Sequence, residues 1–271
     1  MSQKRSDVSH INIIVTIICA LIVAITSIVA SRIAREKVTV YEYKEVPAFD
    51  NINTTSYFPL SAGNSWNYEG TVTIFENETL KISEKKISIT MSVQDEIKNG
   101  NLILFIIKGN PSDASQVLFM PHINNDNIKV PSSFYGYLVV SNKIFFIDEN
   151  RLDDVVKRMK EKNYNAYDIL KQDDIEFEFP LFKGLRYGEV SQITRSDLRY
   201  FWYVNDKITF HESRGDNVSA VSEYQLVYNT SPDYDEIVFR PYLGIISYKY
   251  IHHGTKNEIS LSLTHYNIVQ K

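Results

Sequence analysis

The chain has a single cysteine among its 271 residues, and this residue, Cys19, lies within an apolar run near the N-terminus. The rest of the chain therefore cannot form an internal disulfide, and it offers no thiolate for a metal cluster or for nucleophilic catalysis. An exported domain without disulfides is ordinary in bacteria and less usual in an animal secretory pathway. The cysteine count thus favours a bacterial protein.

An excess of positive charge and a recognisable catalytic motif are also lacking. The 29 Lys and Arg residues are spread along the chain against 33 Asp and Glu, so nothing predicts a nucleic-acid-binding surface. There is no G-x-S-x-G nucleophile turn, no Walker A loop and no Rossmann glycine pattern. We therefore predict no catalytic, cofactor-binding or metal-binding residues, and the sequence leans against an enzyme.

What is present begins with the apolar run Ile11–Ala30, which carries no charge. A helix of about 20 apolar residues crosses a bilayer core of roughly 30 Å, whereas the apolar part of a cleaved signal peptide is usually about 7–15 residues long. We predict a cytoplasmic N-terminus at 1–10, a transmembrane signal anchor at 11–33 and a stalk at 34–56. Cleavage after the run is the alternative.

Two opposing signals bear on the orientation of this anchor. Lys4 and Arg5 precede the run while Arg32, Arg35 and Lys37 follow it, so the positive-inside rule alone places the bulk of the chain in the cytoplasm. The remainder, however, is rich in β-type and aromatic residues, as exported domains are, and long domains can cross a membrane regardless of flanking charge. We predict a single-pass protein of the cell membrane whose bulk is extracytoplasmic.

From Tyr57 onward the dominant pattern is alternation of apolar and polar residues. Residues 87–93 alternate in this way, which predicts a half-buried strand, and Asn99-Gly100 then predicts a hairpin turn. Similar strand pairs are joined through residues 141–142, 205–206 and 254–255. Residues 57–271 are therefore predicted to form a mainly β (β-rich α+β) domain, built as a curved antiparallel sheet or an open barrel.

One amphipathic helix is predicted within this domain, at 151–170. Leu152, Val155 and Met159 recur there at helical spacing, so they define one apolar face. Asp148 or Asn150 can cap the start of the helix, where an acceptor side chain satisfies free backbone N–H groups. We expect this helix to pack against the sheet.

A short segment occurs twice. The first FPL segment, FPLSAGNSW at Phe58–Trp66, is echoed by the second FPL segment, FPLFKGLRY at Phe179–Tyr187. Either two related β units, 57–150 and 175–271, or one continuous sheet that begins its strands in the same way twice would explain the echo. We interpret the segments as structural, with these residues carrying the motif: Phe58, Pro59, Leu60, Gly63, Asn64, Trp66, Tyr68, Phe179, Pro180, Leu181, Gly184 and Tyr187.

The first FPL segment, extended to Tyr68, resembles the FPLxxGNxWxY segment with which a family of uncharacterised bacterial exported and membrane-anchored proteins begins its ordered part. A second likeness lies at Phe239–Ile246, where Tyr242-Leu243 stands in place of the glycine and small residue usual in that family. The family has no established activity. The resemblance therefore implies an exported, β-rich domain and no catalytic residues.

Several side chains are candidates for a ligand surface. Tyr200 and Trp202 share one face of a predicted strand and would line an apolar-ligand surface if the sheet encloses a cavity. His252, His253 and His265 could approach one another across the turn at 254–255, although adjacent strand residues point to opposite faces. Residues 231–236 offer oxygen ligands of the kind that Ca²⁺ prefers, but without a known calcium-loop spacing, so we interpret them as a polar turn.

The sequence supports three classes of function. A non-catalytic binding or envelope-associated module fits best, because β scaffold is abundant and no chemistry is assembled. A cell-surface hydrolase and an accessory or structural subunit of a membrane complex are the alternatives. The partners implied are the membrane itself and a lipid, a small apolar ligand or an envelope protein.

Overall fold

The computed structural model describes residues 53–76, 81–119, 126–161, 170–214, 217–255 and 257–269. The predicted cytoplasmic N-terminus and signal anchor lie outside these residues, as does most of the predicted stalk. Within the described ranges no helix is long and apolar enough to cross a membrane. Three of the last stalk residues instead belong to α2 (Thr54–Tyr57), whose Thr54 is buried in the folded domain.

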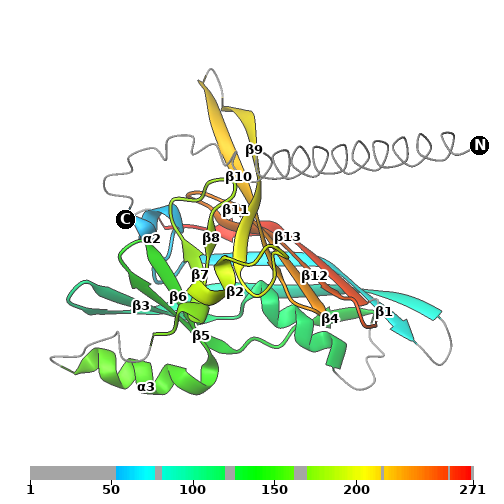
Figure 1. Cartoon of the computed structure of the whole chain (residues 1–271), viewed down its shortest axis with the longest axis horizontal. Coiled ribbons are helices and arrows are strands. Elements are labelled where there is room, and N and C mark those ends of the chain that lie inside the picture. Colours follow the sequence, from blue (N-terminus) through cyan, green and yellow to red (C-terminus); the bar gives the residue numbers. More distant parts are fainter. Residues whose placement is uncertain are drawn as a thin grey trace, which may run out of the picture. The chain divides into compact units, whose positions relative to one another are not determined.

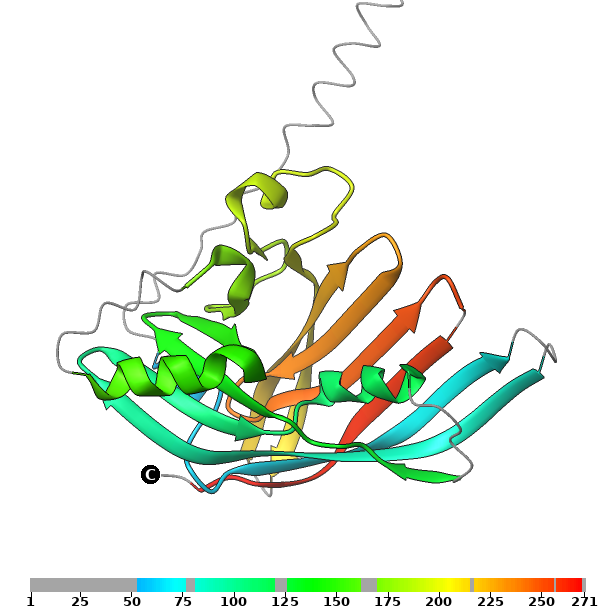
Figure 2. The ribbon, with the colours of Figure 1, turned by 90° about the horizontal axis from the view of Figure 1, so that it is seen from below.

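The described strands form one antiparallel sheet apart from a single parallel pairing of β4 with β2, which confirms the predicted β-rich class and the curved sheet (Figures 1 and 2). Alternating sequence produces these strands because one face packs on the core while the other meets solvent. The strands are β1 Ser65–Glu76, β2 Lys81–Asn99, β3 Leu102–Lys108, β4 Asn127–Lys129, β5 Phe134–Val140, β6 Lys143–Ile147, β7 Ile175–Glu178, β8 Arg186–Tyr187, β9 Trp202–Arg214, β10 Asn217–Asn229, β11 Asp233–Arg240, β12 Gly244–His252 and β13 Asn257–Asn267.

The strand order divides the sheet into two meanders with six strands each along the main path, from which β4 branches off at β2. It runs β7-β6-β5-β3-β2-β1-β13-β12-β11-β10-β9-β8, so β1 to β7 form one meander, β8 to β13 form the other, and β1 pairs with β13 where they join. The free ends of the sheet are β7 and β8, which are consecutive in the chain. Because residues 179–185 alone connect them, the sheet must curl until these edges approach each other. The Tyr187 hydroxyl donates a hydrogen bond of 3.0 Å to the carbonyl of Glu176 across this seam.

The two FPL segments occupy matching places in the two meanders. Gly63 N–H donates to the carbonyl of Val93 at 3.0 Å, and Gly184 N–H donates to the carbonyl of Val204 at 2.8 Å. In return, Val93 and Val204 each donate to the residue that follows the glycine. Each valine precedes a β-bulge, at Gln94 in β2 and at Asn205 in β9. The sequence repeat therefore reflects a structural repeat within one continuous sheet.

This arrangement changes two expectations. The predicted turn at 205–206 is wrong, because β9 runs through both residues and Asn205 is the extra residue of a bulge. A polar Asn-Asp pair is compatible with either a turn or an exposed bulge, and here the strand continues.

The boundary between the two repeated units also lies later in the chain than predicted, after β7 instead of before it. Since β7 pairs with β6, it belongs to the first meander, and the helix before it is an insertion within that meander.

The core is built where the two FPL segments meet. Phe58 and Phe179 both pack on Phe177 and Phe239, with ring-centroid distances between 5.3 and 5.9 Å. All four rings are buried. Large aromatic side chains contribute much apolar area to a core, so we attribute to this cluster a main share of the contact energy between the meanders.

Each FPL segment also docks on a turn of the opposite meander. The Tyr57 carbonyl accepts a hydrogen bond from Tyr242 N–H in the β11–β12 turn, at 2.8 Å. Phe179 N–H donates to the carbonyl of Asn142 in the β5–β6 turn, at 2.9 Å. Ser141 and Tyr242, in these two turns, both have positive φ, 57° and 65°. The turns are thus matched as well as the segments.

The helices are few and mostly short. The amphipathic helix α3 occupies Glu149–Lys160 and starts two residues before the predicted start, because the Asp148 side chain accepts from the N–H groups of Asn150 and Arg151. Its buried residues are Leu152, Val155 and Met159. Residues 162–169 of the predicted helix lie outside the described chain. The other helices are η1 (Pro111–Phe119), which packs on β2, β12 and β13, η3 (Gln172–Asp174) and α4 (Val190–Ile193).

Candidate functional site

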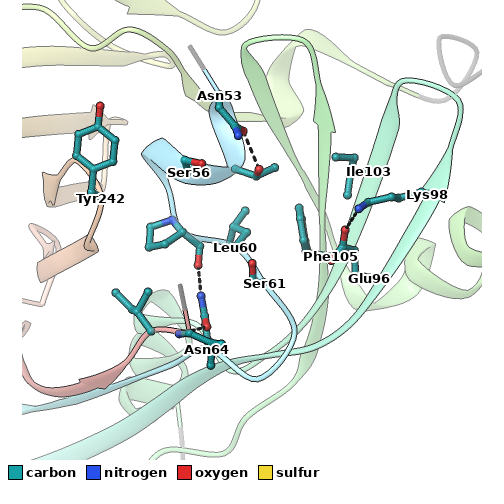
Figure 3. Close-up of a pocket in the computed structure, with 14 residues that line it drawn as sticks. Asn53, Ser56, Leu60, Ser61, Asn64, Glu96, Lys98, Ile103, Phe105 and Tyr242 are labelled. Atoms are coloured by element: carbon teal, nitrogen blue, oxygen red, sulfur yellow. Dashed lines mark hydrogen bonds and ion pairs between the residues drawn. The ribbon is translucent and has the colours of Figure 1, made fainter. Parts of the chain in front are cut away.

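A pocket of about 450 Å³ lies beside the first FPL segment (Figure 3). We call it the FPL pocket. The segment before β1 forms one wall, the β2–β3 hairpin forms another, and the last described residues of the chain close the third. The lining residues are Asn53, Thr55, Ser56, Pro59, Leu60, Ser61, Asn64, Glu96, Lys98, Ile103, Phe105, Tyr242, Ile268 and Val269.

The hairpin wall combines apolar and charged side chains on one face. Glu96 pairs with Phe105 across the two strands and Lys98 pairs with Ile103, so these four side chains project in the same direction. Lys98 Nζ and Glu96 Oε1 form an ion pair at 2.6 Å. Together with buried Pro59 and Leu60, this wall gives the pocket an apolar floor and a polar margin.

Asn64 fixes the shape of the pocket. Its Nδ2 donates to the carbonyl of Pro59 at 2.6 Å, and its Oδ1 accepts from the N–H of Val269 at 2.8 Å. The side chain is only 1% exposed. One buried amide therefore ties the segment before β1 to the residues that follow β13, through hydrogen bonds that are buried or partly buried.

The other motif residues support the wall that carries Tyr242. Trp66 Nε1 donates to the carbonyl of Leu243 at 2.7 Å, and the Tyr68 hydroxyl donates to the carbonyl of Ile245 at 3.0 Å. Between them, a Cβ on Gly244 would lie 2.8 Å from the Phe58 ring, so only glycine fits. The stretches Tyr57–Tyr68 and Phe239–Ile246, which carry the sequence resemblance described above, are therefore in direct contact. Tyr242, at 69% exposure, forms the solvent-exposed edge of the pocket.

A second group of side chains faces the core from the opposite meander. Following the strand register from β8 to β12, Tyr187, Trp202, Tyr228, Asp235 and Tyr250 stand opposite one another in sequence. We call this set the inner row. It continues into Ile259 and Val72, both fully buried, so the row lies on the core-facing side of the sheet.

Carboxylates are enriched around the inner row. The Tyr248 hydroxyl donates to Asp235 at 2.6 Å, and Tyr250 donates to Asp233 at 2.7 Å. Burial raises the pKa of Asp235 to about 6, with a further contribution from the charge of Asp233. Burial likewise raises the pKa of Glu176 on β7 to about 7, and the charge of Asp235 adds to the shift.

Two of the five predicted ligand-surface residues, Trp202 and His252, lie in or beside the inner row. Trp202 belongs to the inner row, where its ring lies 5.4 Å from that of Tyr228. His252 Nδ1 lies 2.7 Å from Asp233 Oδ1, beside the row. Tyr200 is turned out of the strand, with φ 67°, and lines a different pocket. His253 is exposed in the β12–β13 turn.

His265 lies far from the other two histidines. His252 pairs with Asn257, whereas His265 pairs with Asn67 at the other end of β13. Eight residues of strand separate Asn257 from His265, which corresponds to about 26 Å. Among the described residues, no group of three or more His, Cys, Asp or Glu side chains could hold a metal ion.

The sequence analysis missed the carboxylates of the inner row. Asp233, Asp235 and Glu236 were assigned to a polar turn, but they begin strand β11. The signal was the alternation of Asp233, Asp235, Ile237 and Phe239, whose apolar half marks the core-facing side. Because Asp233 and Asp235 at the start of this pattern are polar, the segment has the composition of a turn although it is the beginning of a strand.

Comparisons with known proteins give no family assignment. The sequence matches no protein-family model and no curated protein. Among solved structures, the chain is similar to a candidate exported protein with a YmcC-like fold from Bacteroides fragilis, at 9% identity and a TM-score of 0.32 over 76% of this chain and 96% of that one. It is also similar to a candidate lipoprotein from Parabacteroides distasonis, at 12% identity and a TM-score of 0.28 over 78% and 98%.

Proposed function

We propose that the chain is a single-pass membrane protein whose extracytoplasmic β-rich domain binds a small amphipathic ligand, such as a lipid, in the FPL pocket. The observation that carries the proposal is the pocket itself. It has an apolar floor, a polar margin and a volume of about 450 Å³, within the range of small-molecule sites.

The chemistry of the lining favours an amphipathic ligand over a purely apolar one. Pro59, Leu60, Ile103 and Phe105 offer apolar contact to the body of a ligand. The Glu96–Lys98 pair and the hydroxyl groups of Ser56 and Ser61 lie at the margin, where a polar head would retain contact with water.

The position of the pocket favours a ligand that comes from the membrane. Asn53 and Val269 both line it, so the pocket lies where the folded domain begins and ends. The apolar run Ile11–Ala30 precedes Asn53 by 22 residues, which span at most about 75 Å when fully extended. If that run anchors the chain, the pocket stays within reach of the bilayer surface.

Native mass spectrometry of the full-length protein, extracted from membranes without detergent, tests the proposal. We expect a bound lipid-sized species in the wild type and its loss in Ile103→Trp, whose larger ring fills the pocket. Ile208→Trp is the matched control, because Ile208 is an exposed isoleucine on β9 outside the pocket. A wild type without bound species, or equal retention in both variants, would contradict the proposal.

The hydrolase alternative has one observation in its favour. The Asp233–His252 contact resembles the pairing of an acid with a general base, and the raised carboxyl pKa values nearby are of the kind found at catalytic sites. In the described part of the chain, however, no serine or threonine hydroxyl is hydrogen-bonded to a histidine. Binding is therefore the function that we propose.

A further inference from the structure

A second pocket, of about 380 Å³, opens beside the inner row. Its lining residues are Asp173, Glu189, Gln192, Arg195, Tyr200 and Tyr228. We call it the Gln192 pocket. Tyr228 belongs to both the pocket and the row, so the two are continuous at this residue.

The Gln192 pocket contains an unsatisfied hydrogen-bond acceptor. Gln192 Oε1 is buried and has no hydrogen-bond partner among the residues that the structure describes. A buried amide oxygen without a donor costs about 1–3 kcal/mol, so native proteins rarely leave one unpaired without a reason. The missing element here is an N–H or O–H donor.

Negative charge at this location is also uncompensated. Arg195 is the one basic side chain of the Gln192 pocket, and it is held by Asp197 in two hydrogen bonds of 2.9 and 2.6 Å. Its guanidinium also lies over the Tyr200 ring at 5.1 Å. Asp173 and Glu189 therefore leave the pocket with an excess of carboxylate.

The same imbalance continues into the inner row. Asp235 adds its like charge to the burial that raises the pKa of Glu176, and Asp233, which itself contacts His252, does the same for Asp235. In the described part of the chain Glu176 makes no hydrogen bond or ion pair through its side chain, although the residue is only partly exposed. Desolvated carboxylates are normally paired with a cation.

Aromatic rings complete the surroundings. Tyr228 and Tyr200 line the pocket, Trp202 stands next to Tyr228 in the inner row, and Tyr250 stands on the other side of Asp235. The faces of such rings attract cations, most strongly when water is excluded. The combination of free acceptor, carboxylates and aromatic faces is complementary to an organic ammonium group.

We propose that the Gln192 pocket and the adjoining inner row bind a protonated organic amine. Its N–H groups donate to Gln192 Oε1, and its charge is balanced by the carboxylates of Asp173, Glu189 and Glu176. A linear polyamine fits best, because several carboxylates are distributed from the pocket along the row. This site is separate from the FPL pocket, so it does not depend on the proposed lipid-binding function.

Spermidine titration of the full-length protein tests the proposal, with intrinsic fluorescence as the readout. The chain has two tryptophans, of which Trp66 is fully buried and Trp202 stands in the inner row, so a saturable change reports on the row. At about pH 8 both raised carboxyl groups are ionised. We expect spermidine to saturate the change, and tetramethylammonium, which lacks N–H donors, to bind about tenfold or more weakly.

Two variants separate the contribution of charge to spermidine binding from the contribution of the hydrogen bond to Gln192. Glu176→Gln removes one charge and Gln192→Leu removes the unsatisfied acceptor, and we expect each to weaken spermidine binding by about tenfold. Gln192→Leu should leave tetramethylammonium binding unchanged. Asp153→Asn on the exposed face of α3 is the control for non-specific attraction. No saturable change with millimolar spermidine, unchanged affinity in both variants, or an equal loss in the control overturns the proposal.

Discussion

The two FPL segments have the same backbone arrangement, but their side chains after the leucine have different surroundings. Each begins with a buried phenylalanine, passes through a glycine of positive φ (94° at Gly63 and 89° at Gly184) and joins a bulged partner strand at a valine. At the positions after the leucine, the first segment has Ser61-Ala62 and the second has Phe182-Lys183. Ser61 lines an open pocket, whereas Lys183 forms an ion pair with Asp206 at 2.8 Å.

The strands that follow differ as well. Strand β1 spans Ser65–Glu76 and pairs on both sides, whereas β8 spans only Arg186–Tyr187 and leaves the seam to β7 largely open. The comparison indicates that the repeated residues set the backbone and the core, while the residues between them differ between the segments. Both segments share Phe, Pro, Leu and Gly, and the FPL pocket lies beside the segment that has small side chains after the leucine.

Trp66→Ala should have the largest effect of the changes considered. Trp66 is fully buried and bonded to Leu243, so its truncation leaves a cavity and an unpaired carbonyl. We expect a loss of about 3–5 kcal/mol in the free energy of unfolding. Chemical denaturation of the full-length protein measures it. An unchanged midpoint would show that this end of the first segment is not structural.

Asn64→Leu gives the first segment the residue found at the same place in the second, Leu185. The change leaves the carbonyl of Pro59 and the N–H of Val269 without their partner. We expect a loss of about 2–3 kcal/mol, because buried groups become unsatisfied. Leu185→Asn is the reciprocal control, and it should cost less because Leu185 is partly exposed. Equal losses of unfolding free energy in the two variants would contradict the structural role that we assign to Asn64.

Gly63→Ala and Gly184→Ala compare the two segments directly. Neither glycine has a neighbour within 4 Å of an added Cβ, so the cost arises from positive φ alone. Each change should lower stability by about 1–2 kcal/mol. If the segments are equivalent in backbone, urea denaturation will give similar values for both, and a several-fold difference would argue against equivalence.

The two carboxyl groups near the β7–β8 seam, Glu176 and Asp235, should make the stability of the folded state depend on pH. Glu176 and Asp235 have pKa values raised to about 7 and about 6, so the folded state favours their protonated forms. The contribution of these two groups to stability should therefore be fully present in acid, below their ordinary pKa values of about 4, and be lost as pH rises through 6 to 7. The tyrosines that face Glu176 are Tyr137, Tyr187 and Tyr248, and their own pKa values are raised well beyond this range.

Thermal melts in an amine-free buffer measure this dependence. Glu176→Gln should flatten the fall between pH 5 and 8, since the variant has no charge to desolvate, and the variant should melt higher than the wild type at about pH 8. The effect is expected to be the smallest of those described here, because solvent reaches part of the side chain. A wild-type melting temperature that rises over this range would contradict the assignment.

Local patterns in the sequence predicted the strands and the repeat, but not their closure. Alternation over 87–93 and the Asn99-Gly100 turn are encoded by neighbouring residues, and the structure contains that strand and hairpin. The pairing of β1 with β13 joins the two ends of the domain, and no local signal specifies it. Asn205-Asp206 predicts a turn for the same reason, because neighbouring residues do not reveal a bulge that depends on the partner strand.

The candidate sites were less predictable than the fold. The FPL segment was recognised, but its pocket needs Ile103, Tyr242 and Val269, which come from three distant stretches of the chain. Trp202 and His252 were selected as aromatic and basic residues, yet their common neighbours Tyr228 and Asp233 emerge only from the register of four strands. Such sites are properties of the assembled sheet.

One measurement tests the central claim that the pocket is what distinguishes the first segment. The double change Ser61→Phe and Ala62→Lys copies the second segment into the first, and native mass spectrometry of the full-length protein reports the bound species. We expect the bound species to disappear while the unfolding free energy changes by less than about 1 kcal/mol, because Ala62 is exposed and Ser61 is partly exposed. Retention of the bound species in a folded variant would contradict the claim.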